Sequence, residues 1–293
     1  MNTLKETNAY KTIKKLGRRF KYSPFSKYNP VRILRKFLQK KYKQAIFKIA
    51  LHKATPILVF QMGKVGSTSI YSALKNNYPG VVLHRHHIVD RDWRMHYILD
   101  WAKKGNPIKI ITPIRDPISR NVSLFFHFTE KGNEHNCDIS TYPVSKQVEL
   151  FLDDSFPNEF VFPEYKSIMS QNQPLEWFDK NIEQYFHINV YNTPFPECGY
   201  TSFSHNNTDL LVYRIDISDT KKEQLIKSHI NFSDFSLKNK NIGSLKSYAN
   251  EYKAFQEQAK LPETYLKKMC ESKYFKHFYT QVEIGNIKHK WTK

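Results

Sequence analysis

The chain has 293 residues, of which 40% are hydrophobic, and a formal net charge of +19. This length allows one sizeable core in one or two domains. A membrane-spanning helix is not expected, because Lys48 and Lys53 interrupt the best apolar run and about 18 apolar residues are needed. The N-terminus also lacks the continuous apolar segment of a secretory signal.

Residues 1–53 carry most of the positive charge. They contain 16 of the 46 Lys and Arg residues and a single acidic residue, Glu6, so this segment supplies +15 of the +19. Residues 54–293 are nearly neutral. We therefore predict a basic extension, 1–53, followed by one domain, 54–293, and we do not expect the folded domain to bind nucleic acid.

Within the extension, apolar residues between Val31 and Leu51 recur at steps of three and four, which predicts a helix with a Lys-rich opposite face. Such a helix suits an anionic membrane surface. The alternative is a helix that packs on its own domain. The predicted location is cytoplasmic, with attachment to the inner face of the membrane if the first interpretation holds.

The three cysteines, Cys137, Cys198 and Cys270, are scattered and show no C-x-x-C spacing. This fits a reducing cytosol and predicts no metal site.

The segment 56–72 is the most informative. An apolar run ends in a turn with two glycines, and a helical pattern follows from Ile70. A strand that leads through a glycine turn into a helix start forms a binding site for phosphate or sulfate, because the first helical N–H groups have no intrahelical acceptors. The expected anion-binding residues are Lys64, Val65, Gly66, Ser67, Thr68 and Ser69.

This turn does not match the nucleotide-triphosphate loop G-x-x-x-x-G-K-[ST], because Lys64 precedes Gly66. The order Lys-x-Gly-Ser/Thr resembles the 5′-phosphosulfate loop of sulfotransferases. A structural turn without any ligand is the alternative.

A second strand-to-helix junction lies at residues 108–126. A β-branched apolar run ends at Arg115, and Asp116 with Pro117 predicts a helix start, with Asp as the N-cap and Pro at the first helical position. Arg115 and Ser123 have the spacing of the 3′-phosphate-binding element of sulfotransferases, which they resemble. The alternative role for Arg115 is a structural salt bridge.

Later segments resemble a bacterial family of capsular polysaccharide synthesis proteins that belongs with the sulfotransferases. The resemblance covers about residues 54–285 and includes Trp177-Phe178-Asp179, Phe186 to Tyr191, Leu210 to Arg214, Asn241 to Tyr248 and Lys276 to Tyr279. It implies that a loop from Asn241 to Lys246 closes over the 3′-phosphate.

The order of strands and helices predicts an α/β fold, a three-layer sandwich with a central parallel sheet. The resemblance implies the sulfotransferase fold, which is similar to that of P-loop NTPases. Residues 131–172 are expected to form loops and a short helix that could bind the acceptor. Further expected elements are strands 80–84, 186–191 and 210–215 and helices 90–104, 174–186, 219–229, 244–260 and 262–280.

The resemblance implies a transferase that uses 3′-phosphoadenosine-5′-phosphosulfate (PAPS), releases 3′,5′-diphosphoadenosine (PAP) and acts on a glycan hydroxyl without a metal. Lys64 would neutralise the leaving group. His84 and His86 alternate at a strand end and so face the same side, and His86 is the preferred base with His84 second. Glu164 and Glu176 are alternative bases.

Two other functions stay open. One is a P-loop kinase or NTPase that uses ATP, and the other is a polysaccharide- or nucleic-acid-binding adaptor without catalytic activity whose binding depends on the basic extension.

Overall fold

The computed structural model describes residues 30–88, 92–128, 139–153, 170–237 and 247–292. The chain divides into two compact units, Met1–Ala54 and Thr55–Lys293. The described part of the first unit is a helix, α2 (Pro30–Leu51). A search of the described residues finds no helix with the length and hydrophobicity needed to cross a membrane.

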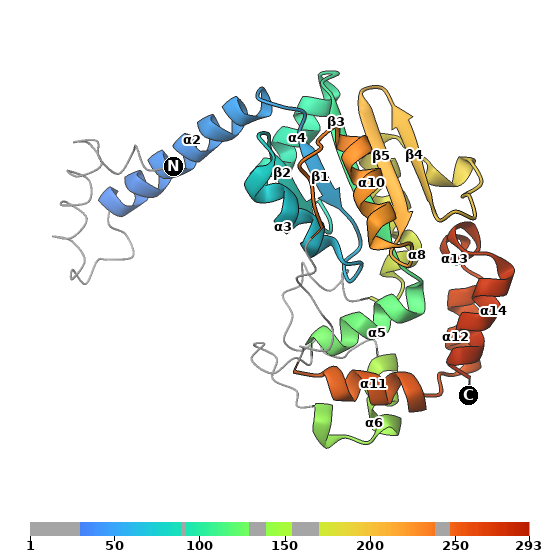
Figure 1. Cartoon of the computed structure of the whole chain (residues 1–293). Coiled ribbons are helices and arrows are strands. Elements are labelled where there is room, and N and C mark those ends of the chain that lie inside the picture. Colours follow the sequence, from blue (N-terminus) through green and yellow to red (C-terminus); the bar gives the residue numbers. More distant parts are fainter. Residues whose placement is uncertain (1–29, 89–91, 129–138, 154–169, 238–246, 293) are drawn as a thin grey trace. The chain divides into compact units, whose positions relative to one another are not determined.

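The second unit is a mixed α/β structure around a central five-stranded sheet (Figure 1). The strand order is β2-β1-β3-β5-β4. The strands are β1 (Ile57–Phe60), β2 (Val82–Arg85), β3 (Ile108–Ile114), β4 (Tyr200–His205) and β5 (Thr208–Arg214).

Helices flank this sheet and pack beyond its ends. The α-helices of the first half are α3 (Ser67–Asn77), α4 (Trp93–Lys103), α5 (Pro117–Phe128) and α6 (Val144–Leu152). Those of the second half are α8 (Gln173–Trp177), α9 (Gln184–Phe186), α10 (Asp219–Ile230), α11 (Ala249–Gln258), α12 (Glu263–Cys270), α13 (Lys273–Phe278) and α14 (Gln281–Lys290). Short 3₁₀ turns occur at η2 (Ile139–Thr141) and η5 (Val190–Asn192), and η4 (Phe178–Glu183) is a π-helix between α8 and α9.

Side chains along β1 point alternately to the two faces of the sheet, so the strand contributes to the packing on both faces. Ile57 and Val59 are buried with residues of α3 and α10 on one face. Phe60 points to the other face, where its ring lies 5.0 Å from Trp177 and 6.2 Å from Phe186. The sheet is therefore covered by α3 and α10 on one side and by the α8–α9 segment on the other.

The sheet places the two predicted anion-binding segments side by side. β1 and β3 are parallel neighbours, with Leu58 opposite Ile110, so the turns after them meet at the same edge. The chain moves from β1 to β2 on one side and later to β3 on the other side, which makes the carboxyl end of β1 a topological switch point. Ligands of open α/β sheets bind in the crevice at such points.

Three aromatic-rich helices pack together beyond this edge of the sheet (Figure 1). Phe125 of α5 lies 5.7 Å from Phe151 of α6 and 6.2 Å from Phe255 of α11. This packing fixes α11 close to the strand ends, because α5 begins directly after β3. The expected helix 244–260 is observed as α11, and its first residues lie outside the described part.

Several expectations about the elements were wrong. The predicted strand 186–191 is instead the end of α9 and a 3₁₀ turn, because His187 takes a left-handed conformation and Asn189 caps the turn. The sheet is not wholly parallel, since β4 pairs antiparallel with β5. The predicted helix 262–280 is two helices, because Ser272 caps a new start.

Candidate functional site

The turn between β1 and α3 has an unusual backbone. Gly63, Lys64 and Gly66 all have positive φ, at 86°, 61° and 74°. A residue with a side chain rarely adopts this conformation, so the protein holds Lys64 in a strained state, a feature that recurs at functional sites. Lys64 is half-buried, whereas Gly66 is exposed. The turn therefore exposes Gly66 two residues after a lysine.

The start of α3 offers hydrogen-bond donors at this turn. The helix begins at Ser67, and Gly66 at the N-cap supplies no side-chain cap. The first backbone N–H groups have no acceptor within the helix, and the helix dipole is positive here. Thr68 is exposed and Ser69 half-buried, whereas the side chain of Val65 is buried, so Val65 can contribute only its backbone. The arrangement suits an anion.

Gln61, which no sequence motif marks, holds the turn in place from the inside. Its side chain is fully buried, and its Oε1 accepts a hydrogen bond from the Gly63 backbone N–H. This bond fixes the orientation of the amide, so that Nε2 faces away from Gly63. Nε2 lies 2.7 Å from Ser67 Oγ, 3.1 Å from His84 Nε2 and 2.8 Å from His86 Nδ1.

These contacts define a proton arrangement, which we assign from the network. Gln61 Nε2 donates to Ser67 Oγ, and the Ser67 hydroxyl donates to His84 Nε2 at 2.8 Å. His86 Nδ1 lies 3.1 Å from the backbone carbonyl oxygen of Gln61 and 2.8 Å from Gln61 Nε2, so it donates to the first in one tautomer and accepts from the second in the other. In the tautomer that carries its hydrogen on Nδ1, His86 Nε2 keeps its lone pair and can accept a proton.

Burial holds the histidines in their neutral form. The pKa of His84 falls to about 4, chiefly because burial disfavours its charged form, with further contributions from His86 and Arg85. Burial also lowers the pKa of His86, although its bond to Gln61 opposes this, and the positive charges of Arg120 and Lys64 add to the lowering. A bound anion would offset these positive charges and raise both pKa values.

Arg115 reaches the same turn from the end of β3. Its Nη1 lies 3.5 Å from the Lys64 carbonyl oxygen, and its Nη2 lies 3.3 Å from the Tyr252 hydroxyl of α11. The Tyr274 hydroxyl donates to the Arg115 carbonyl at 2.8 Å. These contacts place the guanidinium beside the turn after β1.

Arg115 has no ion pair within the described residues, in contrast to arginines at two other strand ends. Arg85 pairs with Asp92, and Arg214 pairs with Asp216 and Glu283. A structural salt bridge, the alternative role considered for Arg115, is therefore not observed in this part of the chain. A half-buried guanidinium without a carboxylate is suited to an anionic ligand.

Arg120 is a second functional candidate that was not anticipated. It is fully buried on α5, and its Nη2 donates to the Met62 carbonyl at 2.7 Å while Nη1 donates to Asn121 Oδ1 at 3.0 Å. Burial lowers its pKa to about 9. Its charge lies directly under the turn, and Ser123, three residues later, lies on the same side of α5.

The structure brings together most of the residues predicted for the site. Lys64, Arg115, His84 and His86 meet at the ends of three neighbouring strands. Ser67 is also present, but its hydroxyl is engaged by His84 and Gln61 rather than directed outward. Asn241, Lys246 and Glu164 lie outside the described residues. No group of three or more potential metal ligands (His, Cys, Asp or Glu) occurs in the part of the chain that is described.

Comparison with known proteins gives one match. Residues 160–280 match the NKWYS family, described as "Putative capsular polysaccharide synthesis protein". No curated protein and no solved structure matches. The matched segment includes β4, β5 and the α8–α9 segment, but not the turn after β1 or Arg115. The family name suggests involvement in capsular polysaccharide synthesis and hints at a biosynthetic enzyme.

The pKa of His84 predicts a specific pH dependence of stability. Its folded-state pKa of about 4 lies below the ordinary value of 6.5, so the unfolded chain binds more protons as the pH falls from 6.5 to 4, and stability is lost in this window. For His84→Gln we expect the free energy of unfolding to fall between pH 7 and pH 5 by about 1 kcal/mol less than in the unmodified chain. This figure allows for the partial exposure of His84. Urea unfolding at both pH values measures this, and equal losses in the two proteins would contradict it.

Proposed function

We propose that this chain transfers a sulfuryl group from PAPS to a carbohydrate hydroxyl during synthesis of a capsular or cell-surface polysaccharide. The main support is the position of Arg115, whose guanidinium lies against the turn that carries Lys64 and has no carboxylate partner among the described residues. A donor with phosphates at both ends of its ribose needs two cationic sites, one for each phosphate. The proposal includes the sulfotransferase fold.

In this proposal the α3 N-terminus binds the 5′-phosphosulfate. Backbone N–H groups of Gly66 to Ser69 face the phosphate, with the Thr68 and Ser69 hydroxyls beside them. Arg115 binds the 3′-phosphate, and Ser123 contributes a hydroxyl from α5. Asn241 and Lys246 remain the proposed residues of a closing loop. Tyr252 positions Arg115 through its hydroxyl.

The reaction forms an acceptor O–S bond and breaks the bond from sulfur to the bridging oxygen of the 5′-phosphate. His86 Nε2 takes the proton of the acceptor hydroxyl, and PAP leaves with the bond electrons. Lys64 and the α3 N-terminus neutralise the charge that grows on the leaving phosphate. His84 accepts a hydrogen bond from Ser67, and its ring packs against the ring of His86. No metal takes part in this scheme.

The ATP-dependent alternative is less well supported. P-loop enzymes use a Ser or Thr hydroxyl at the start of the helix to bind magnesium. Here the corresponding Ser67 hydroxyl is bonded to His84 at 2.8 Å and lies in a buried side chain. An adaptor without catalytic activity would not need the strained Lys64 or the buried Gln61 network.

The first prediction concerns nucleotide binding. PAP should raise the thermal unfolding midpoint of the full chain, because a ligand that binds only the folded state stabilises it. Arg115→Ala should weaken PAP binding by about 2 to 5 kcal/mol, since the 3′-phosphate loses its charge partner. Isothermal titration calorimetry measures both affinities.

Arg214→Ala is the matched control. Arg214 ends the neighbouring parallel strand, but its guanidinium is bound to Asp216 and Glu283. This variant should lose stability and keep its affinity for PAP. Absence of PAP binding by the unmodified chain, or tighter binding of ATP with magnesium, would refute the proposed donor.

The second prediction separates binding from turnover. Lys64→Ala and His86→Gln should each slow the release of PAP from PAPS in the presence of an acceptor glycan, by about 10²-fold or more, because each acts on charge or protons in the transition state. Lys75→Ala, at the opposite end of α3, is the control and should behave like the unmodified chain. A Lys64→Ala enzyme with unchanged turnover would remove Lys64 from the mechanism.

We also propose that α2 attaches the protein to an anionic membrane surface. The helix contains seven Lys or Arg residues and no acidic residue. The described part of the chain exposes nine large hydrophobic side chains, and seven of them belong to α2: Ile33, Leu34, Phe37, Leu38, Tyr42, Ile46 and Ile49. Apolar and basic side chains on one helix match the interior and the headgroups of an anionic bilayer.

The third prediction tests this attachment. The full chain should sediment with vesicles that contain phosphatidylglycerol but not with vesicles of phosphatidylcholine alone, and added salt should release it. The double variant Leu34→Asp/Leu38→Asp should stay in solution, whereas Val282→Asp, at an exposed hydrophobic position of α14, should still bind. Equal sedimentation of both variants, or self-association without vesicles that the double variant abolishes, would contradict the membrane proposal.

A further inference from the structure

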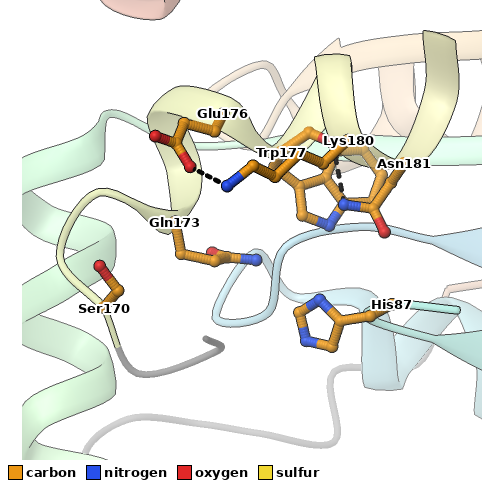
Figure 2. A pocket seen from close by; sticks show the side chains of 7 residues that line it. All are labelled: His87, Ser170, Gln173, Glu176, Trp177, Lys180 and Asn181. Atoms are coloured by element: carbon orange, nitrogen blue, oxygen red, sulfur yellow. Dashed lines mark hydrogen bonds and ion pairs between the residues drawn. The ribbon is translucent and has the colours of Figure 1, made fainter. Parts of the chain in front are cut away.

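A pocket lies beside the candidate site, on the side of β2. It has a volume of about 350 Å³ and is lined by His87, Ser170 and one face of the α8–η4 helix (Figure 2). His87 directly follows the proposed base His86, and the indole N–H of Trp177 donates to the His86 carbonyl at 2.7 Å. One side chain that lines the pocket is therefore hydrogen-bonded to the backbone of the proposed base.

The helical wall owes its shape to a π-helical segment. Gln173, Trp177, Lys180 and Asn181 share one face of the α8–η4 helix, and the π-helix begins directly after Trp177. Asn181 Nδ2 donates to the Trp177 carbonyl at 3.0 Å, so a side chain supplies a bond at the place where the helix widens. Such π-helical segments frequently mark functional sites.

The pocket contains polar atoms that lack partners. Gln173 is 8% exposed, and within the described part of the chain neither its Oε1 nor its Nε2 forms a hydrogen bond. His87 Nε2 is likewise buried and has no partner among the residues that the structure describes. Figure 2 shows these two side chains pointing toward one another across the pocket. A buried amide without hydrogen bonds lowers the stability of the folded state by about 1 to 3 kcal/mol, so its presence needs an explanation.

The charges of the side chains that line the pocket indicate which class of ligand it can bind. Glu176 and Lys180 form an ion pair with each other at its rim. Burial lowers the pKa of His87 to about 4, so its ring is neutral at neutral pH. An amide and a neutral imidazole offer donors and acceptors without net charge. Sugar hydroxyls, each both donor and acceptor, match this set.

The strand order separates this pocket from the proposed nucleotide position. A donor that extends from the turn after β1 to Arg115 runs toward β3. The pocket lies next to His87, which follows β2 on the opposite side of β1. Trp177 is 1% exposed, so its indole face is covered and offers no stacking surface for adenine.

We propose that the pocket between His87 and Gln173 binds an uncharged sugar ring of the acceptor and presents one of its hydroxyls to His86. Gln173 acts as a positioning residue that hydrogen-bonds the ring. A volume near the lower end of the usual range of about 300 to 1,000 Å³ for ligand pockets fits one or two rings. This inference rests on the proposed transfer to a carbohydrate.

The test uses the full chain and saturation-transfer NMR with methyl glycosides of glucose, galactose and N-acetylglucosamine at tens of millimolar. The unmodified chain should bind at least one of them. Gln173→Met should weaken that binding about tenfold or more, and its thermal midpoint should be equal or higher, because an unsatisfied amide is replaced by an apolar side chain of similar size.

Gln147→Met is the matched control. Gln147 is also buried, but its Nε2 donates to the carbonyls of Ile139 and Tyr142, so this variant should lose stability and keep sugar binding. Sugar binding by Gln173→Met equal to that of the unmodified chain would overturn the inference, as would absence of binding to the whole panel. Loss of PAP affinity in Gln173→Met would make the pocket an adenine site instead. PAP binding by the unmodified chain is measured separately, so failure of the sugar site and failure of the proposed donor are distinguishable.

Discussion

The site depends on one buried amide, that of Gln61. This side chain directly follows the interior strand β1. Its Oε1 accepts from the turn at Gly63, and its Nε2 lies within hydrogen-bond distance of Ser67 at the start of α3 and of His84 and His86 at the end of β2. Its bonds are strong in such a dry environment, and a buried amide without them would be costly. Three separate segments are thereby held in one arrangement, and the strained backbone at Lys64 is stabilised as part of it.

Positive charge is concentrated around the turn. Arg115 lies on one side of the Lys64 turn, and Arg120 lies beneath it with a fully buried side chain. Burial lowers the pKa of His86, and the charges of Arg120 and Lys64 lower it further. Arrival of an anionic donor would reduce this effect and make the imidazoles stronger bases, which couples donor binding to the proton transfer that the proposed reaction requires. The basic character of the site is independent of the basic extension.

The sequence predicted the segments in which local chemistry decides the structure. The turn after β1, the Asp116-Pro117 helix start and the strands around them need only nearby residues, and they appear as expected. Gln61 could not be recognised, because its partners His84 and His86 lie 23 and 25 residues away. Two missed elements did leave signals. The Asn206-Asn207 pair marks the tight turn between β4 and β5, and the Thr280–Glu283 capping box marks the start of α14.

The position of β2 has a consequence for the behaviour of the protein. This strand has four residues, lies at the edge of the sheet and pairs only with β1 among the described strands. It carries His84, and His86 and His87 follow it. Edge elements with few pairings open at low free energy, often without global unfolding. The proposed base thus follows an edge strand of the sheet, so bound ligands that bridge β1 and β2 would slow amide hydrogen exchange there before they affect the core.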